Sequence, residues 1–157
     1  MTEVLQRIQK SKEEKLHYLD LSGLALDTIP AEIVELPWLQ ALSLSRNKIR
    51  DISILDKLPM LHKLALTHNR IKDISVLEQL PKLRFIFLGH NCIEDITRIG
   101  EHPRLKKLVL NDNKIQTLPS MRQFELLAFL DISGNPLTAL SYEAMKEQLP
   151  VLKIYNS

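Results

Sequence analysis

The chain of 157 residues lacks the features of several protein classes. Its single cysteine, Cys92, cannot form an internal disulfide, so a reducing compartment is expected. The first residues contain no apolar run typical of a signal peptide. Nowhere do about 18 apolar residues follow one another, so no membrane-spanning helix is expected. These absences favour a cytoplasmic location, although export by a route that reads no classical signal stays open.

The sequence also lacks a strong charge and the common catalytic motifs. Its 21 lysines and arginines nearly balance 19 aspartates and glutamates, and a net charge of +2 is too small for a protein dedicated to nucleic acid. The four glycines are scattered and form no phosphate-binding loop, and neither a nucleophile motif nor HExxH occurs. We therefore expect no catalytic residue and no cofactor, and an enzyme is the hypothesis ranked last.

The apolar residues are plentiful but of few kinds. They make up 45% of the chain and are mostly leucine and isoleucine, whereas aromatic residues contribute only 5%. A core made mostly of leucine and isoleucine side chains indicates that one small unit is repeated. The length is that of a single domain, which we place at residues 1–157.

An eleven-residue phrase recurs every 22 residues and carries an asparagine at its ninth position. It reads, for example, LHKLALTHNRI and LRFIFLGHNCI, with apolar residues at the first, fourth and sixth positions. An earlier copy, LHYLDLSGLAL, begins at Leu16 and has Leu24 in the place of the asparagine. The recurring asparagines are Asn47, Asn69, Asn91, Asn113 and Asn135.

This phrase predicts a short strand followed by a tight turn. Alternating apolar residues give the strand one buried side, which neighbouring repeats must cover by stacking into a continuous core. The asparagine amide can bond the unpaired backbone groups of the turn, and stacked copies can form a ladder. We therefore interpret the five asparagines as structural.

The second half of each unit indicates a short helical turn on the opposite surface. Ser53 is followed by Asp56 and Ser75 by Glu78, a spacing that resembles a capping box. A Leu-Pro pair, or His102-Pro103 in one repeat, then follows, and its proline ends the turn and favours an extended backbone at the start of the next strand. So few residues allow only short 3₁₀ helices.

Both ends are expected to carry caps that shield the core. Val4, Leu5 and Ile8 give an apolar face to a predicted helix over residues 2–14. Good helix formers occupy Ser141 to Gln148, and a last strand is predicted within Leu149 to Tyr155. The expectation is a complete small protein, divided into a cap over residues 1–15, six repeats over 16–140 and a cap over 141–157.

These phrases resemble the leucine-rich repeat family, in its class with 22-residue units of the form LxxLxLxxNxIxxIxxLxxLPxL. The resemblance covers residues 16–155. The C-terminal segment NPLTALSYEAMKEQLPVLKIYN resembles the cap of this class, with Tyr155 and Asn156 in place of Leu-Asp. The opening LDLSGLALDTIPAEIVELPWL is closer to bacterial and Roco-type repeats. The resemblance implies an α/β solenoid, a right-handed arc with a concave parallel sheet, 3₁₀ turns on the convex side, and protein recognition on the concave face.

The third, fifth and seventh positions of the phrase should face outward from the sheet. Most are small or polar, but the fourth repeat places Phe85 and Phe87 there, and Gly89 is expected to leave open space. Exposed aromatics at the centre of a sheet are typical of binding anchors, although Phe85 or Phe129 could instead fold over the rim onto the core. The predicted partner-binding residues are Tyr18, Lys63, Phe85, Phe87, Lys107, Val109 and Phe129.

Basic residues are expected on both rims of the sheet. They either form a solvated surface or steer an acidic partner toward the groove. One rim holds Arg46, Lys48, Arg50, Arg70 and Lys72, and the other holds Lys82, Arg84, Arg104, Lys106 and Lys107.

Three histidines are candidates for a chemical role. His68 and His90 occupy equivalent positions near Cys92, but no fourth ligand is apparent, and we expect no metal site. His102 replaces a core leucine and is predicted to be partly buried and hydrogen-bonded. The favoured function is a monomeric scaffold that binds another protein. Binding of RNA or another polyanion through the rims is the alternative.

Overall fold

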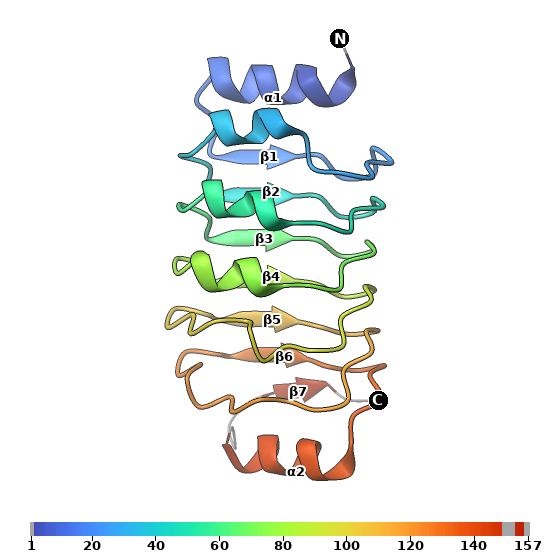
Figure 1. The fold of residues 1–157 in the computed structure, drawn as a ribbon. Coiled ribbons are helices and arrows are strands. Elements are labelled where there is room, and N and C mark those ends of the chain that lie inside the picture. Colours follow the sequence, from blue (N-terminus) through green and yellow to red (C-terminus); the bar gives the residue numbers. More distant parts are fainter. Residues whose placement is uncertain (1, 149–152, 156–157) are drawn as a thin grey trace.

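A computed structural model describes residues 2–148 and 153–155 of the chain, and within them the repeats form a column with one continuous parallel sheet (Figure 1). The strands pair in chain order, each with the next. Each strand begins at the third position of its repeat, as the apolar alternation predicts. The strands are β1 Tyr18–Asp20, β2 Ala41–Ser43, β3 Lys63–Ala65, β4 Phe85–Phe87, β5 Lys107–Val109, β6 Phe129–Asp131 and β7 Lys153–Tyr155.

The repeat length sets the register of the sheet. Residues that lie 22 apart are direct partners, so Leu42 pairs with Leu64 and Ile86 with Leu108. These middle residues of the strands are buried, and the leucines and isoleucines of the other apolar positions join them in one core. The predicted α/β leucine-rich solenoid is confirmed in this arrangement.

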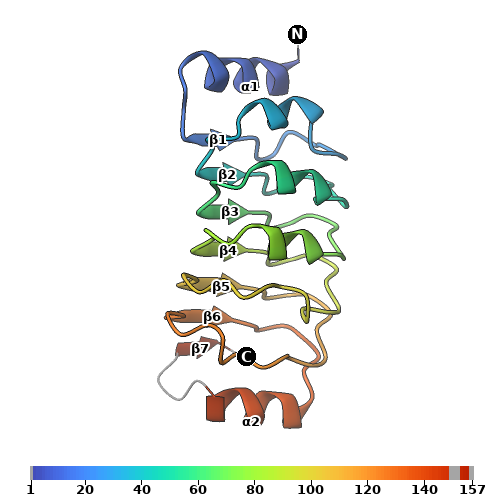
Figure 2. The same ribbon diagram turned by 60° about the vertical axis from the view of Figure 1, so that its left-hand side comes forward.

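Short 3₁₀ helices lie on the side of the column away from the strands (Figure 2), as predicted. The predicted capping boxes, however, are wrong. Ser53 and Ser75 are the first helical residues rather than the caps, so their hydroxyls cannot close the helix start. Instead the carboxylates of Asp51 and Asp73 accept the backbone N–H of Ser53 and Ser75, each at 2.8 Å. The helices are η1 Ala31–Glu35, η2 Ser53–Lys57 and η3 Ser75–Gln79.

The fourth repeat departs from this pattern. Its return segment forms a turn rather than a 3₁₀ helix, and Gly100 adopts a φ of +95° there. A Cβ atom at this position would lie 3.0 Å from the Cα of Glu78 in the preceding repeat. Glycine is therefore required both for the backbone conformation and for the close approach.

His102 follows this turn and occupies the place of the core leucines Leu58 and Leu80. The sequence predicted a partly buried side chain, but the imidazole is only 2% exposed. Its Nε2 lies 2.6 Å from the carbonyl oxygen of Ile99, whereas Nδ1 is buried without a partner among the described residues. Burial lowers the pKa of His102, because the charged ring would lose its hydration.

We expect His102→Leu to remove an acid-sensitive component of stability. Because the folded pKa is below the unfolded value of about 6.5, this component is complete above pH 6.5 and decreases as the pH falls toward the folded pKa. One such group contributes a slope of at most about 1.4 kcal/mol per pH unit. Urea unfolding at several pH values between 5 and 7.5 measures it. An equal slope in both proteins would contradict the assignment.

Helices lie at both ends of the column (Figure 1). Helix α1, Glu3–Glu13, contacts β1 and η1; it buries Ile8, while Val4 and Leu5 are half-buried. The Arg7 guanidinium also donates to the carbonyl oxygen of Asp20, at 2.8 Å. Helix α2, Ala139–Gln148, starts two residues earlier than predicted and contributes Met145 to the core.

The predicted last strand is present in part, as β7, which pairs with β6. The rest of that prediction, residues 149–152, and the cap residue Asn156 lie outside the described residues. In the described part of the chain, no helix combines the length and apolar character needed to cross a bilayer.

Candidate partner-binding face of the sheet

The five asparagines lie where each strand turns into the loop, and each amide links two repeats. Asn91 is typical: its Nδ2 donates to the carbonyl oxygens of Leu88 in its own repeat and Leu66 in the preceding one, both at 3.0 Å. Its Oδ1 accepts the backbone N–H of Ile71, also at 3.0 Å. Asn69, Asn91 and Asn113 are buried, while Asn47 and Asn135 at the ends of the ladder are half-buried.

The seven predicted binding residues all belong to strands and alternate with buried core residues. Tyr18, on β1, is 53% exposed, and Lys63 is also exposed. Tyr18 is separated from Lys63 by Ala41 on the intervening strand, so it does not join the others. The other five are half-buried, namely Phe85, Phe87, Lys107, Val109 and Phe129.

The register places lysine and phenylalanine alternately along one row. Lys63 pairs with Phe85, Phe85 with Lys107, and Lys107 with Phe129. In the neighbouring row, Phe87 pairs with Val109. We call the six residues from Lys63 to Phe129 that form these two rows the central cluster: Lys63, Phe85, Phe87, Lys107, Val109 and Phe129.

Lysine side chains lie over the aromatic rings of the central cluster. The ammonium nitrogen of Lys107 is 4.0 Å from the ring centre of Phe129 and 5.6 Å from that of Phe87. The ammonium nitrogen of Lys63 is 5.8 Å from the Phe87 ring centre. These distances are those of cation–π contacts. The predicted apolar patch is thus a mixed surface, in which lysines partly cover the rings.

Gly89 does not leave the predicted open space. It is buried, and a Cβ atom there would lie 2.2 Å from the side-chain oxygen of Asn111. The Asn111 side chain of the next repeat fills this position, and its Nδ2 donates to Asp112 at 2.6 Å. The hollow expected beside the phenylalanines is therefore closed.

Aspartates lie on the same face toward both ends of the sheet. Asp20, on β1, accepts the backbone N–H of Ser22 at 2.9 Å, and its hydrogen bonds from Ser22 lower the pKa of the carboxyl group. Asp131, on β6, accepts a hydrogen bond from the hydroxyl of Ser133 at 2.7 Å. Burial and the charge of Asp20 raise the pKa of the Tyr18 hydroxyl. The face therefore carries lysines at its centre and an aspartate on each side of them, on β1 and on β6.

The edge where β4 and β5 begin continues the basic centre. Burial lowers the pKa of His62, and the charges of Arg84, Lys82 and Arg104 lower it further. Within residues 2–148, no carboxylate lies within 4.0 Å of any cation of this edge or of Lys63 and Lys107. We call this edge, with its four cations, the basic edge: Lys82, Arg84, Arg104 and Lys106.

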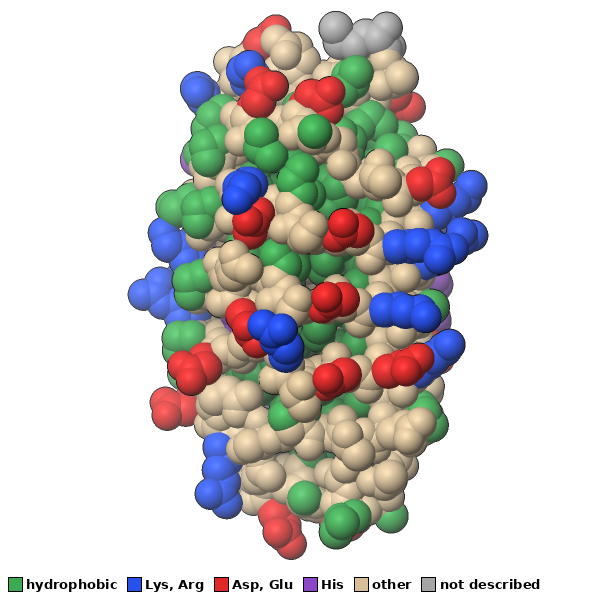
Figure 3. Space-filling view, viewed as in Figure 1, with side chains coloured by type: hydrophobic (Ala, Val, Ile, Leu, Met, Phe, Trp, Pro, Cys, Tyr) green, Lys and Arg blue, Asp and Glu red, His purple; other side chains and the backbone are tan. Residues whose placement is uncertain are grey.

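The opposite rim carries the five other predicted cations, all exposed. Arg50 lines a small pocket together with Asp51 and Asp73. Figure 3 shows acidic side chains down the middle of the surface formed by the return segments, with basic ones along both flanks. The rim cations are Arg46, Lys48, Arg50, Arg70 and Lys72.

His68 and His90 stack on one another, with ring centres 4.1 Å apart and planes inclined by 7°. The Nε2 of His90 is 3.4 Å from a carboxylate oxygen of Asp112, and Cys92 is half-buried. Among the described residues, no three or more His, Cys, Asp or Glu side chains are grouped so that they could hold a metal ion.

Sequence reasoning missed that the eighth position of each phrase has a positive φ. The available signal was glycine at this position in two of the six copies, Gly23 and Gly134. These residues lie stacked along one rim, with histidines in the middle. They are Gly23, Arg46, His68, His90, Asp112 and Gly134.

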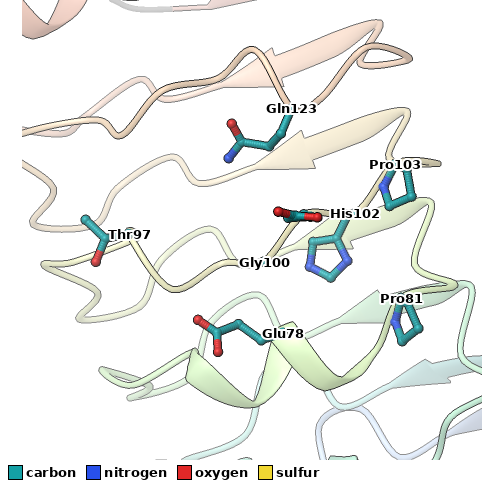
Figure 4. A pocket seen from close by; sticks show the side chains of 8 residues that line it. Glu78, Pro81, Thr97, Gly100, His102, Pro103 and Gln123 are labelled. Carbon is teal, nitrogen blue, oxygen red and sulfur yellow. The ribbon is translucent and has the colours of Figure 1, made fainter.

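Sequence reasoning also missed an open pocket of about 790 Å³ on the other side of the column (Figure 4). It lies beside the turn that replaces a helix in the fourth repeat. Glu78, one of its lining residues, forms an ion pair with Arg98 at 3.2 Å. The sequence did contain a signal for this pocket, because Gly100 and His102 depart from the residues found at the equivalent positions of the earlier repeats. The lining residues are Glu78, Pro81, Thr97, Gly100, Glu101, His102, Pro103 and Gln123.

Two family models match the sequence. One is described as a leucine-rich repeat and matches residues 14–71, and the other, described as two copies of leucine-rich repeats, matches residues 59–100. No curated protein matches the sequence significantly.

Several solved structures are similar. An internalin C2 from Listeria monocytogenes shares 26% identity and a TM-score of 0.76 over 84% of this chain and 57% of its own. A second internalin from that organism shares 25% identity and a TM-score of 0.65, over 85% of this chain and 47% of its own. A leucine-rich repeat protein from Leptospira interrogans shares 25% identity and a TM-score of 0.65, over 82% and 40%. The chain thus spans about half the length of these proteins.

Proposed function

Since the chain belongs to the leucine-rich repeat family, we propose that it is a protein-interaction module whose partner covers the central cluster on the face of the sheet. The family models and the internalin structures support interaction as the general role. The residues that carry a specific role must come from this chain's own surface, because one fold serves many partners.

The distribution of phenylalanine is the observation that carries the proposal. The chain has four phenylalanines, and only Phe124 lies in the core, where it is 1% exposed. The other three lie on the outer face of the sheet, two on β4 and one on β6, with Lys107 and Val109 of β5 between them. Apolar rings grouped on a surface are typical of binding anchors.

We further propose that the protein acts as a cytoplasmic monomer and has no catalytic role. Helix α1 covers the β1 end of the sheet, which leaves that edge strand closed to pairing with a second chain. The charged side chains of the face are two lysines that lie over phenylalanine rings and two aspartates that accept hydrogen bonds from serines. Such an arrangement serves contact rather than proton transfer.

Binding of RNA or another polyanion is the second candidate, and the cations of the basic edge, which have no carboxylate within 4.0 Å among residues 2–148, favour it. The two candidates differ in salt dependence. Contacts with a phosphate backbone release counterions, so affinity would fall steeply between about 50 and 200 mM salt. Binding anchored by Phe87 depends less on salt.

Phe87→Ser tests the proposal. We expect the free energy of unfolding to change by less than about 1 kcal/mol, because the ring is half-buried and lies outside the core. We also expect binding to partners recovered from lysate to be lost. Urea unfolding and quantitative pull-down measure the two effects. The control Tyr18→Ser removes an aromatic ring from the same face, outside the central cluster, and should keep binding. A large loss of stability in Phe87→Ser would place Phe87 in the core instead.

A further inference from the structure

Two lysines flank one aromatic ring at the centre of the face. Lys63 and Lys107 lie on the strands either side of β4, and each ammonium nitrogen is within 6 Å of the Phe87 ring centre, at 5.8 and 5.6 Å. Their strands are two spacings apart, which separates the backbones by about 10 Å. The ring therefore has a positive charge on each side.

These charges are available to a partner. Within residues 2–148, neither lysine has a carboxylate within 4.0 Å, and Lys63 is exposed while Lys107 is half-buried. The basic edge adds four further cations beside the same strands. Charge complementarity with this surface requires acidic groups on the partner.

The two aspartates that flank the central cluster limit the length of an acidic occupant. Asp20 lies on β1 and Asp131 on β6, so the strands free of acidic side chains are β2 to β5. These strands span about 14 Å, and the two aspartate-bearing strands are about 24 Å apart. An extended segment of roughly four to seven residues fills this interval. A longer run of negative charge would meet both aspartates.

We infer that the partner contacts this face with a short acidic segment, in which carboxylates bind Lys63 and Lys107 and an apolar side chain between them packs on Phe87 and Val109. The inference rests on the proposed function, and it adds the chemistry of the partner. Carboxylates two to four residues apart in an extended segment lie within reach of both flexible lysine arms.

A nucleic acid fits this face less well than an acidic peptide. Its phosphates continue along the strand at regular spacing, so a bound oligonucleotide longer than the basic centre brings negative charge against Asp20 and Asp131. Phe87 and Val109 also form an apolar surface, which an aliphatic side chain covers closely.

Selection from a random dodecapeptide display library on the full chain tests the inference. We expect enriched peptides to carry Asp or Glu on both sides of a large apolar residue. As synthetic labelled peptides, they should bind about tenfold more weakly to Lys63→Glu and to Lys107→Glu. The control variants Lys48→Glu and Lys72→Glu make the same charge change on the opposite rim and should bind normally.

Charge exchange makes the test specific. A peptide with its carboxylates replaced by lysines should bind the Lys63→Glu/Lys107→Glu double variant better than it binds the unmodified chain, which a merely structural effect would not produce. Circular dichroism confirms that the variant is folded.

The other outcomes separate the inference from the proposed function. Enriched peptides that depend on Phe87 but bind both lysine variants normally overturn the acidic segment and leave the proposed function intact. Enriched peptides that bind Phe87→Ser normally, or a failure to enrich any peptide, overturn both. A labelled twelve-nucleotide oligouridine serves as the comparison ligand. If it binds the unmodified chain but not the lysine variants, and no acidic peptides are enriched, the face binds a polyanion and the inference is wrong.

Discussion

Asn91→Ala is expected to lower the free energy of unfolding by about 1–3 kcal/mol. The amide of Asn91 satisfies the carbonyl oxygens of Leu66 and Leu88 and the backbone N–H of Ile71. It is 8% exposed, so water does not readily replace these bonds after the side chain is removed. The backbone N–H of Ile71 would then be left unpaired in the interior, while the carbonyl oxygens of Leu66 and Leu88 would each lose one of two bonds and keep the one from Asn69 or Asn113.

Urea unfolding followed by circular dichroism measures this loss. Asn111→Ala is a suitable control, because Asn111 is half-exposed and its Nδ2 bonds to the neighbouring Asp112 side chain. The control should change stability by less than about 0.5 kcal/mol. Equal midpoints for the unmodified chain and Asn91→Ala would show that the ladder does not stabilise the fold.

Deletion of residues 2–14 is expected to convert the protein into a self-associating form. Helix α1 contacts β1 and η1, and its removal uncovers the end of the core near Leu19 and Leu21, which are 4% and 0% exposed. The free edge of β1 would also become available for pairing with another chain. Light scattering coupled to size-exclusion chromatography should detect oligomers, and thermal unfolding should begin at a lower temperature.

Two point variants distinguish loss of the cap from other effects of deletion. Ile8→Asp places a charge at a side chain that is 3% exposed, and should weaken the cap. Gln9→Asp makes a similar change on the exposed side of the same helix and should behave like the unmodified chain. If the deleted protein stays monomeric and equally heat-resistant, α1 does not protect the core.

The parts of this protein that could be predicted from its sequence are those that repeat. A spacing of 22 residues brings equivalent positions into register, so the strands, the buried leucines and the place of the asparagines follow from the periodic pattern alone. The physical reason is that stacking is the only way in which such short strands bury their apolar sides. The outward positions of Phe85 and Phe87 follow from the same alternation.

The tertiary structure decided what each outward or irregular side chain contacts. Lys107 turns toward the rings of Phe129 and Phe87, although the register alone would equally place its charge in solvent. Asn111 fills the space above Gly89, and the turn at Gly100 opens a pocket where a helix was expected. Periodicity determines which strand a residue lies on and which side it faces, whereas the reach of a long side chain depends on the neighbours that surround it once the repeats are stacked.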